Sequence, residues 1–338
     1  MKSEKDTAFE SAVASIRKTH GADAIMDMSG ERSEQFKVDF LSTGCLSLDQ
    51  VLGGGLPRGR VIEIFGAPSS GKSVLSTYLM AQIQKGGGKA VLVDSEFSFS
   101  PDFARKIGID IDALSLVQAS TAEEALDIVS KLTEASAVDI IVIDSVASLV
   151  PKAELEGDIT DQSMALQARI LSKGLRMLTG AIAKSKTIVI FINQVREKVG
   201  VFYGPKTVTP GGTALKFYSS IRMEIKKGKN ITVGDDAKGE VIGNWIGVNI
   251  VKNKVAPPFR QCEIELIYEK GLDQIGDLLD TAVKNGTLKR QGNTYYFNEV
   301  KLGVGREASK KFLADEANSK LYAEIYHTLI KWKVNYED

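Results

Sequence analysis

An eight-residue segment constrains the fold of this chain more than any other feature. Residues 66–73 read Gly-Ala-Pro-Ser-Ser-Gly-Lys-Ser and match the pattern G-x-x-x-x-G-K-[ST]. The apolar run 60–66 before it reads as a buried strand, and residues 72–85 after it read as a helix. The segment therefore predicts a strand–loop–helix unit, here called the phosphate loop, whose backbone N–H groups and helix N-terminus bind nucleotide phosphates.

Individual roles in the phosphate loop follow from this pattern. Lys72 is predicted to reach the β- and γ-phosphates, and the Ser73 hydroxyl is predicted to ligate Mg²⁺. The predicted nucleotide-binding residues are Gly66, Ala67, Pro68, Ser69, Ser70, Gly71, Lys72, Ser73 and Val74. The alternative interpretation is a chance turn rich in glycine and serine, which the correct strand and helix on either side argue against.

Two acidic residues follow other apolar runs. Asp144 ends the run 138–144, where such enzymes place the carboxylate that holds Mg²⁺. Glu96 lies just beyond a predicted strand, on the same side as Asp94 by strand alternation. We predict that Glu96 orients the attacking water, because it is the better placed of the two to reach a γ-phosphate. The alternative is a strand-end acid exposed to solvent.

The rest of the chain predicts an α/β fold. Apolar, β-branched runs alternate with helical stretches and lie at 60–66, 89–96, 138–145 and 187–194. Such runs indicate a mostly parallel sheet that is covered on both faces. Later runs have little helix between them and lie at 215–227, 245–254 and 262–271. These predict an antiparallel extension of the same sheet.

We divide the chain into three parts. Residues 1–35 carry Phe9, Val13 and Ile16 at helical spacing, so we predict an oligomerisation helix and a linker. So small an apolar stripe needs another surface, which is either the chain's own core or a neighbouring subunit. Residues 36–271 form the predicted ATPase core, and residues 272–338 form a small α+β domain.

Composition excludes several classes of protein. The start of the chain is charged and no apolar run reaches the roughly 18 residues of a membrane span, so neither a secretory signal nor a membrane protein is expected. Cys45 and Cys262 are the only cysteines, which argues against a disulfide framework and fits a reducing cytoplasm.

Charge is unevenly distributed although the net charge is zero. Residues 162–230 hold thirteen Lys or Arg residues but only two acids, which favours a face that binds a polyanion. Two loops, at 154–164 and 194–213, are the predicted contact segments, and Met164 and Val199 are candidate apolar wedges between bases. For any one basic residue the alternative is an ordinary solvated charge.

Several segments together resemble the bacterial RecA family of recombinases. They are 42–73, 145–176, 190–204, 211–222 and 251–268, and they occur in the family's order. The resemblance implies a RecA-type ATPase core in which Glu96 is the catalytic glutamate and Gln194 senses the γ-phosphate of ATP. It also implies that Lys252 and Lys254 reach toward the ATP of a neighbouring subunit.

The resemblance assigns further residues to three groups. Phe103 falls on the position that stacks on adenine, and Tyr268 lies near the nucleotide. Lys216, Phe217 and Arg222 match the subunit interface. The positions that match DNA contacts or belong to the same loops are Met164, Arg169, Ser172, Arg176, Arg196, Val199, Gly200, Gly211, Gly212 and Thr213.

The resemblance implies an ATP- and Mg²⁺-dependent DNA recombinase. Such a protein forms a homo-oligomeric helical filament on single-stranded DNA, pairs it with homologous duplex DNA and exchanges strands in DNA repair and the SOS response, in association with the nucleoid. Phe97 and Ser100 depart from the family's usual His and Asp, so the resemblance does not extend to adenine selectivity.

Three other functions are open to a phosphate-loop protein. A ring-forming, helicase-like motor would use an arginine finger, where this chain has Lys252 and Lys254. A regulator that uses ATP only as a switch would not need Glu96 and Gln194. A small-molecule kinase would need a substrate lid, for which the basic, glycine-rich loop 194–213 is a poor candidate.

Overall fold

The structure is a computed structural model that describes residues 3–28, 33, 36–157, 164–197, 207–233 and 239–334. By its internal contacts the chain forms two compact units, Met1–Asp39 and Phe40–Asp338.

The first unit is built around helix α1 (Glu4–His20), which is followed by a 3-10 turn at Ala22–Ala24. Ser3 and Asp6 form a capping box at the start of α1, with the Ser3 hydroxyl accepting the Asp6 N–H at 3.2 Å. None of the residues of α1 is buried, and Phe9 is 64% exposed. The predicted helix is therefore present, and its apolar stripe has no cover within its own unit.

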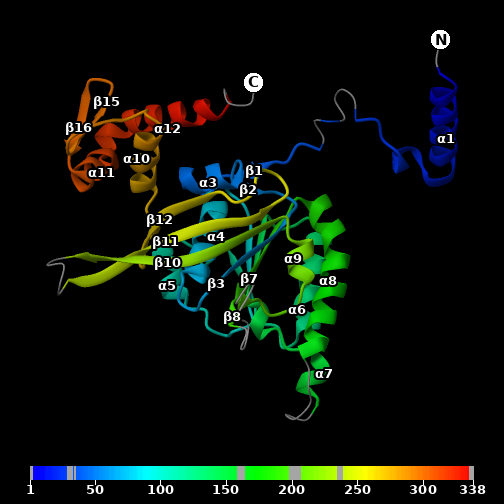
Figure 1. Ribbon diagram of the computed structural model, residues 1–338. Coiled ribbons are helices and arrows are strands. Elements are labelled where there is room, and N and C mark those ends of the chain that lie inside the picture. The colour runs from blue at the N-terminus through cyan, green and yellow to red at the C-terminus, as the bar shows by residue number, and fades with distance from the viewer. Residues whose placement is uncertain are drawn as a thin grey trace. The chain divides into compact units, whose positions relative to one another are not determined.

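The second unit contains a nine-stranded sheet in the order β13-β12-β11-β10-β3-β7-β6-β4-β5 (Figure 1). Its parallel strands are β3 (Val61–Gly66), β4 (Ala90–Asp94), β5 (Leu114–Val117), β6 (Ile140–Asp144), β7 (Ile188–Gln194) and β10 (Ile221–Val233). The antiparallel strands are β11 (Glu240–Asn253), β12 (Gln261–Ile267) and β13 (Gly271–Leu272). The prediction of a mostly parallel sheet with an antiparallel extension is confirmed.

Strand alternation sorts the core into two layers, because successive side chains point to opposite faces. Helices on the first face are α3 (Leu46–Leu52), α4 (Lys72–Lys85) and α5 (Pro101–Ile107). Helices on the second face are α6 (Ala122–Glu134), α8 (Met164–Ser185) and α9 (Ala214–Tyr218). Ile62 and Ile64 of β3 face the first layer and Val61 faces the second, so both faces of the strand are buried.

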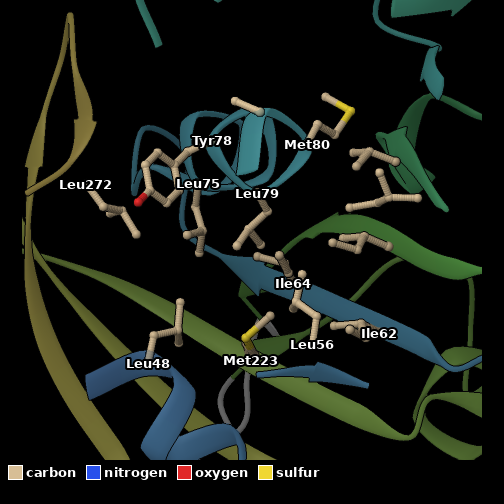
Figure 2. Packing of buried hydrophobic residues seen from close by; sticks show 14 of the residues in the cluster. Leu48, Leu56, Ile62, Ile64, Leu75, Tyr78, Leu79, Met80, Met223 and Leu272 are labelled. Atoms are coloured by element: carbon tan, nitrogen blue, oxygen red, sulfur yellow. The ribbon is translucent and has the colours of Figure 1, made fainter. Parts of the chain in front are cut away.

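Helix α4 fixes the position of the phosphate loop on this sheet. Figure 2 shows Leu75 and Leu79 of α4 packed over Ile64 of β3, all with 0% exposure. Because these apolar contacts hold the strand and the helix together, the loop between them is anchored at both ends.

Short elements precede or connect the main strands. They are β1 (Phe40–Leu41), β2 (Leu56–Pro57), a 3-10 turn (Val146–Ser148), α7 (Lys152–Leu155), β8 (Arg196–Glu197) and β9 (Thr207–Val208). Strands β8 and β9 pair antiparallel, so the segment predicted as a loop from 194 to 213 includes a short hairpin ladder in its described part.

The C-terminal part of the second unit has its own small core. Its elements are α10 (Gln274–Lys284), β14 (Lys289–Gln291), β15 (Thr294–Phe297), β16 (Val300–Val304), α11 (Arg306–Ala314), a 3-10 turn (Glu316–Asn318) and α12 (Ser319–Val334). The three strands form an antiparallel sheet, which confirms the predicted small α+β domain. Leu46 of α3 belongs to the same apolar cluster, so this part packs directly on the core. Among the described helices, none has the length and apolar character to cross a bilayer.

Candidate functional site

The phosphate loop adopts a backbone path that depends on its glycines. Ser69 and Gly71 have φ values of 57° and 97°, in the left-handed region. A Cβ at Gly66 would lie 2.3 Å from the Ile225 carbonyl oxygen, and one at Gly71 would lie 2.8 Å from Leu266 Cδ2. The two glycines of the pattern are thus required because the loop lies against β10 and β12 of the sheet.

Polar groups of the loop are buried and available to an anion. Lys72 is only 8% exposed, and its Nζ donates to the Ala67 carbonyl at 2.7 Å. Burial lowers the pKa of Lys72, while Asp144 and Glu96 oppose this shift. The buried Ser70 Oγ has no hydrogen-bond partner among the described residues. A phosphate would supply acceptors to both side chains, so the loop fits a nucleotide.

Asp144 and Ser73 form the candidate magnesium site. Asp144 ends β6 beside the phosphate loop, where the Ser73 hydroxyl acts to lower the pKa of its carboxyl. Burial raises the pKa of Asp144 to about 6, with Glu96 and Asp94 adding to the rise and Ser73 and Lys72 opposing it. A hydroxyl and a carboxylate are oxygen ligands of the kind Mg²⁺ prefers, and its charge would offset the crowding of carboxylates. The donor set therefore fits this ion.

Glu96 is held in place by residues from two neighbouring strands. The Ser145 hydroxyl donates to Glu96 Oε1 at 2.5 Å, and Gln194 Nε2 donates to the same oxygen at 3.3 Å. Ser148 Oγ lies 3.5 Å from it. Because β4, β6 and β7 are neighbours, their carboxyl ends bring Glu96, Ser145 and Gln194 together. The second oxygen of Glu96 has no hydrogen bond to the described residues that would keep it from a water molecule.

Asp94 and Glu96 point to the same side of the strand by alternation, but their carboxylates have different partners. The Asp94 carboxylate accepts the backbone N–H groups of Ser98 at 3.3 Å and Phe99 at 3.1 Å. These bonds shape the turn after β4, in which Phe97 has a φ of 53°. Sequence reasoning missed Ser145 as a partner of Glu96, and its position directly after Asp144 at a strand end is the signal that could have found it.

A cavity of about 100 Å³ lies beside the candidate magnesium site. Its lining includes Ser73, Thr77, Ser100, Phe103 and Asp144. The Ser100 hydroxyl caps α5 by accepting the Phe103 N–H at 3.4 Å, and Phe103 is 38% exposed. Tyr268 is half-buried after β12 and is not one of the lining residues.

Lys252 and Lys254 bind the end of α9 in the same chain. Lys252 Nζ donates to the carbonyls of Lys216 at 2.5 Å and Phe217 at 3.1 Å, and Lys254 Nζ donates to the Phe217 carbonyl at 3.4 Å. Cations at a helix C-terminus are favourable because they meet free carbonyls. Burial lowers the pKa of Lys252, and Lys254 and Arg222 lower it further. The described contacts of these lysines are thus with α9 and not with their own phosphate loop.

The predicted interface residues surround these lysines. Phe217 is 71% exposed, whereas the Arg222 side chain is only 14% exposed and pairs with Glu63. Lys216 is half-buried. Phe217 is therefore free to contact another molecule, while Arg222 is engaged inside the sheet.

Most of the described DNA-contact candidates lie on α8 and near the start of α9. Arg169 and Arg176 are exposed and Ser172 is half-buried, and their spacing puts them on one side of α8. A Cβ at Gly211 would lie 2.6 Å from Leu171 Cδ1, and one at Gly212 would lie 2.9 Å from Ala168 Cβ. The end of the predicted contact segment 194–213 therefore lies against α8, with the two glycines packed on that helix.

Of the remaining candidates, two are described by the structure. Arg196 in β8 and Thr213 before α9 are exposed. Val199 and Gly200 lie outside the described residues, and only the backbone of Met164 is described.

Comparison with known proteins agrees with this geometry. The RecA N-terminal domain matches residues 7–273, and the RecA C-terminal domain matches residues 276–332. A protein named Protein RecA from Clostridium acetobutylicum is 46% identical over 325 residues, covering 96% of this chain and 91% of its own length. Proteins of the same name from Bacillus thuringiensis and Halalkalibacterium halodurans are 48% and 47% identical, each covering 96% of this chain and 92% of their own length. The chain therefore belongs to the RecA family.

Proposed function

We propose that this protein is an ATP-dependent DNA recombinase that forms a helical filament on single-stranded DNA, pairs it with a homologous duplex and exchanges strands. ATP hydrolysis is stimulated by DNA and recycles the filament. Family membership supports a role in recombination and repair. Its relatives are named Protein RecA. One observation in this chain supports the proposed DNA-stimulated ATPase activity.

That observation is the hydrogen bond from Gln194 Nε2 to Glu96 Oε1, 3.3 Å long. Gln194 ends β7, and the segment that follows it returns at Gly211 to pack on α8 beside Arg169. A movement of Gln194 therefore moves both the Glu96 carboxylate and the segment expected to contact DNA. This arrangement supports coupling between hydrolysis and DNA binding.

Each residue of the site has a task in hydrolysis. The phosphate loop amides and Lys72 hold the phosphates of ATP, and Ser73 and Asp144 are the residues that would hold Mg²⁺. When bound, Mg²⁺ neutralises charge that develops on the phosphate oxygens. Glu96 accepts a hydrogen bond from the attacking water and orients it. Ser145 holds Glu96 in position, and Gln194 responds to the γ-phosphate.

Assembly into a filament is supported by groups that the chain leaves uncovered. Phe217 is 71% exposed beside Lys252 and Lys254, and the apolar stripe of α1 is exposed in its own unit. We propose that α1 packs on a neighbouring subunit and that both lysines reach the neighbour's ATP. Such a head-to-tail contact does not close on itself and so produces a helix of subunits.

The test is the ATPase rate with and without single-stranded DNA, in the wild type and in Glu96→Gln. The proposal predicts strong stimulation by DNA, and a fall in kcat of roughly 10²–10⁴-fold in the variant because an oriented base is lost. Glu123→Gln, in α6 and outside the site, is the matched control and should retain the wild-type rate.

Each outcome separates the proposal from its alternatives. A wild-type rate that does not respond to DNA contradicts the coupled mechanism and favours a regulator switched by ATP. Stimulation by DNA together with translocation along the strand, but without strand exchange, favours a ring-forming motor.

A further inference from the structure

A buried polar network joins the end of β7 to the segment before α9. Asn193 has 0% exposure, and its Nδ2 donates to Glu63 Oε1 at 3.0 Å and to the Pro210 carbonyl at 3.1 Å. Its Oδ1 accepts the Gln194 N–H at 3.0 Å. Both amide protons and the amide oxygen are therefore used, so the side chain has one defined orientation.

Glu63 and Arg222 anchor this network inside the sheet. Glu63 also has 0% exposure, and its second oxygen accepts a bond from Arg222 Nε at 2.5 Å. Arg222 also lies over the Phe65 ring, with Cζ 4.6 Å from the centroid. A buried carboxylate is costly unless it is paired and hydrogen-bonded, and here each Glu63 oxygen has a donor. The network is thus a fully bonded unit that resists partial displacement.

The positions that the network joins are those that the proposed function needs to couple. On one side is Gln194, which bonds to Glu96 and whose own N–H is held by Asn193. On the other side is Pro210, directly before Gly211 and Gly212, which pack on α8. Asn193 is the residue that contacts both sides through its side chain.

Strand preference does not explain an asparagine here. Ile188–Ile192 of β7 are all apolar and buried, and a strand buried on both faces favours such residues. An apolar residue at 193 would remove the Asn193 amide that donates to the buried Glu63 Oε1. The network therefore serves to fix the end of β7 relative to the segment before α9, more than to fill the core.

We propose that Asn193 and Glu63 are positioning residues that couple Gln194 to the Pro210–Thr213 segment. Because the Asn193 amide bonds to both, Gln194 and the Pro210–Thr213 segment move together. Binding of DNA at Gly211–Thr213 and α8 therefore changes the positions of Gln194 and Glu96. This inference rests on the proposed DNA-stimulated hydrolysis. Asn193 and Glu63 touch neither the nucleotide site nor the DNA-contact side chains directly, and they act through Gln194 and Pro210.

The test uses the full chain and two substitutions of Asn193. Asn193→Ala removes the amide, and Asn193→Asp keeps its shape but replaces the donor with an acceptor that faces Glu63. The first readout is the ratio of the ATPase kcat with single-stranded DNA to that without it. The second is hydrogen–deuterium exchange of peptides covering residues 207–218, which does not depend on activity.

The matched control is Asn244→Ala. Asn244 is another buried asparagine of the same sheet, 2% exposed, and its amide donates to the Trp245 carbonyl at 2.7 Å, away from the β7 end. We expect both Asn193 variants to lower the stimulation ratio by about tenfold, as the loss of one to two hydrogen bonds would. Exchange at 207–218 should become faster, while Asn244→Ala should match the wild type in both readouts.

The outcomes are distinguishable. A ratio within twofold of the wild type in Asn193→Ala, or an equal loss in Asn244→Ala, overturns the inference. If the wild type itself is not stimulated by DNA, the proposed function fails, and the exchange measurement alone then decides whether Asn193 holds the 207–218 segment.

Discussion

Gln194 Nε2 and Glu96 Oε1 are joined by a 3.3 Å hydrogen bond that connects the end of β7 to the turn after β4. The same Glu96 oxygen accepts the Ser145 hydroxyl, so one carboxylate is oriented from the ends of β6 and β7. A group with two fixed donors on one oxygen presents its other oxygen in a defined direction. The activity of this site should therefore depend on the residues that orient Glu96 as well as on Glu96 itself.

Ser145→Ala tests this dependence. Loss of the hydroxyl removes a hydrogen bond to a charged group, worth about 1.5–3 kcal/mol, so we expect kcat for ATP hydrolysis to fall by about tenfold or more. KM for ATP should change little, because the phosphate loop is intact. Ser148→Ala is the control, since its hydroxyl is 3.5 Å from Glu96 and should contribute less. Equal effects of the two substitutions would contradict the orientation assigned to Ser145.

Gly66→Ala tests the close approach of the phosphate loop to β10. The new Cβ would lie 2.3 Å from a backbone carbonyl of Ile225, which cannot rotate away as a side chain could. We expect lower Tm and loss of nucleotide binding, measured by thermal unfolding with and without ATP. Gly180→Ala in α8 is the control, because its Cβ meets nothing within 4 Å and Ala favours a helix by roughly 0.5–1 kcal/mol. A variant at 66 that is as stable as the variant at 180 would disprove the steric argument.

The buried carboxyl of Asp277 in α10, which contacts α3, should make the stability of the protein depend on pH. Asp277 is 7% exposed and accepts the Ser47 N–H at 3.1 Å. Burial, with a smaller contribution from Asp280, raises the pKa of Asp277 from 3.8 to about 6, although Ser47 and the backbone of Leu46 act to lower it. Since the folded pKa is the higher one, stability is greatest with the carboxyl protonated. About 3 kcal/mol is therefore lost as pH rises from about 4 to about 6.

Chemical unfolding of Asp277→Asn across this pH range checks this dependence. The difference in unfolding free energy between the variant and the wild type should grow in favour of the variant as pH rises to about 6, and then stay level. Asp102→Asn, at a side chain that is 91% exposed, should show no such trend. A difference that is constant with pH would mean that Asp277 does not titrate in this window.

Arg169 tests the DNA-contact face of α8. If its side chain neutralises one phosphate of single-stranded DNA, Arg169→Ala should reduce the slope of log K against log salt concentration by about 0.7. Fluorescence anisotropy with a labelled oligonucleotide, in the presence of a non-hydrolysable ATP analogue, measures this slope. Arg105→Ala is the control, because Arg105 is paired with Asp102 at 2.9 Å on α5. An unchanged slope at 169 would remove this residue from the interface.

The α/β architecture was predictable because its signals are local. A run such as 188–192 is apolar at every position, and this requires cover on both faces of a strand whatever the neighbours are. Lys72, Ser73 and Asp144 were likewise identified from their places at strand and helix ends, which the parallel sheet brings to one edge. These predictions could be made from the sequence because each depends on few residues and a fixed period.

Partners of the site residues could not be predicted in this way. Nothing in the sequence around Ser145 indicates Glu96, which is 49 residues away, and Asn193 and Glu63 are separated by 130. Strand order decides which of these side chains meet, and strand order follows from packing of the whole sheet. The partners of Lys252 and Lys254 could not be predicted either, because their hydrogen bonds to the end of α9 depend on how β11 lies beside β10.

The sequence by itself determined the phosphate loop, the buried strands and the family, because spacing and apolar periodicity are written along the chain. Only the tertiary structure decided that one oxygen of Glu96 is shared by Ser145 and Gln194 and that Asn193 links Gln194 to Pro210. The physical reason is that a hydrogen bond requires two groups within about 3 Å, and the position of the second group is set by the packing of strands distant in the chain.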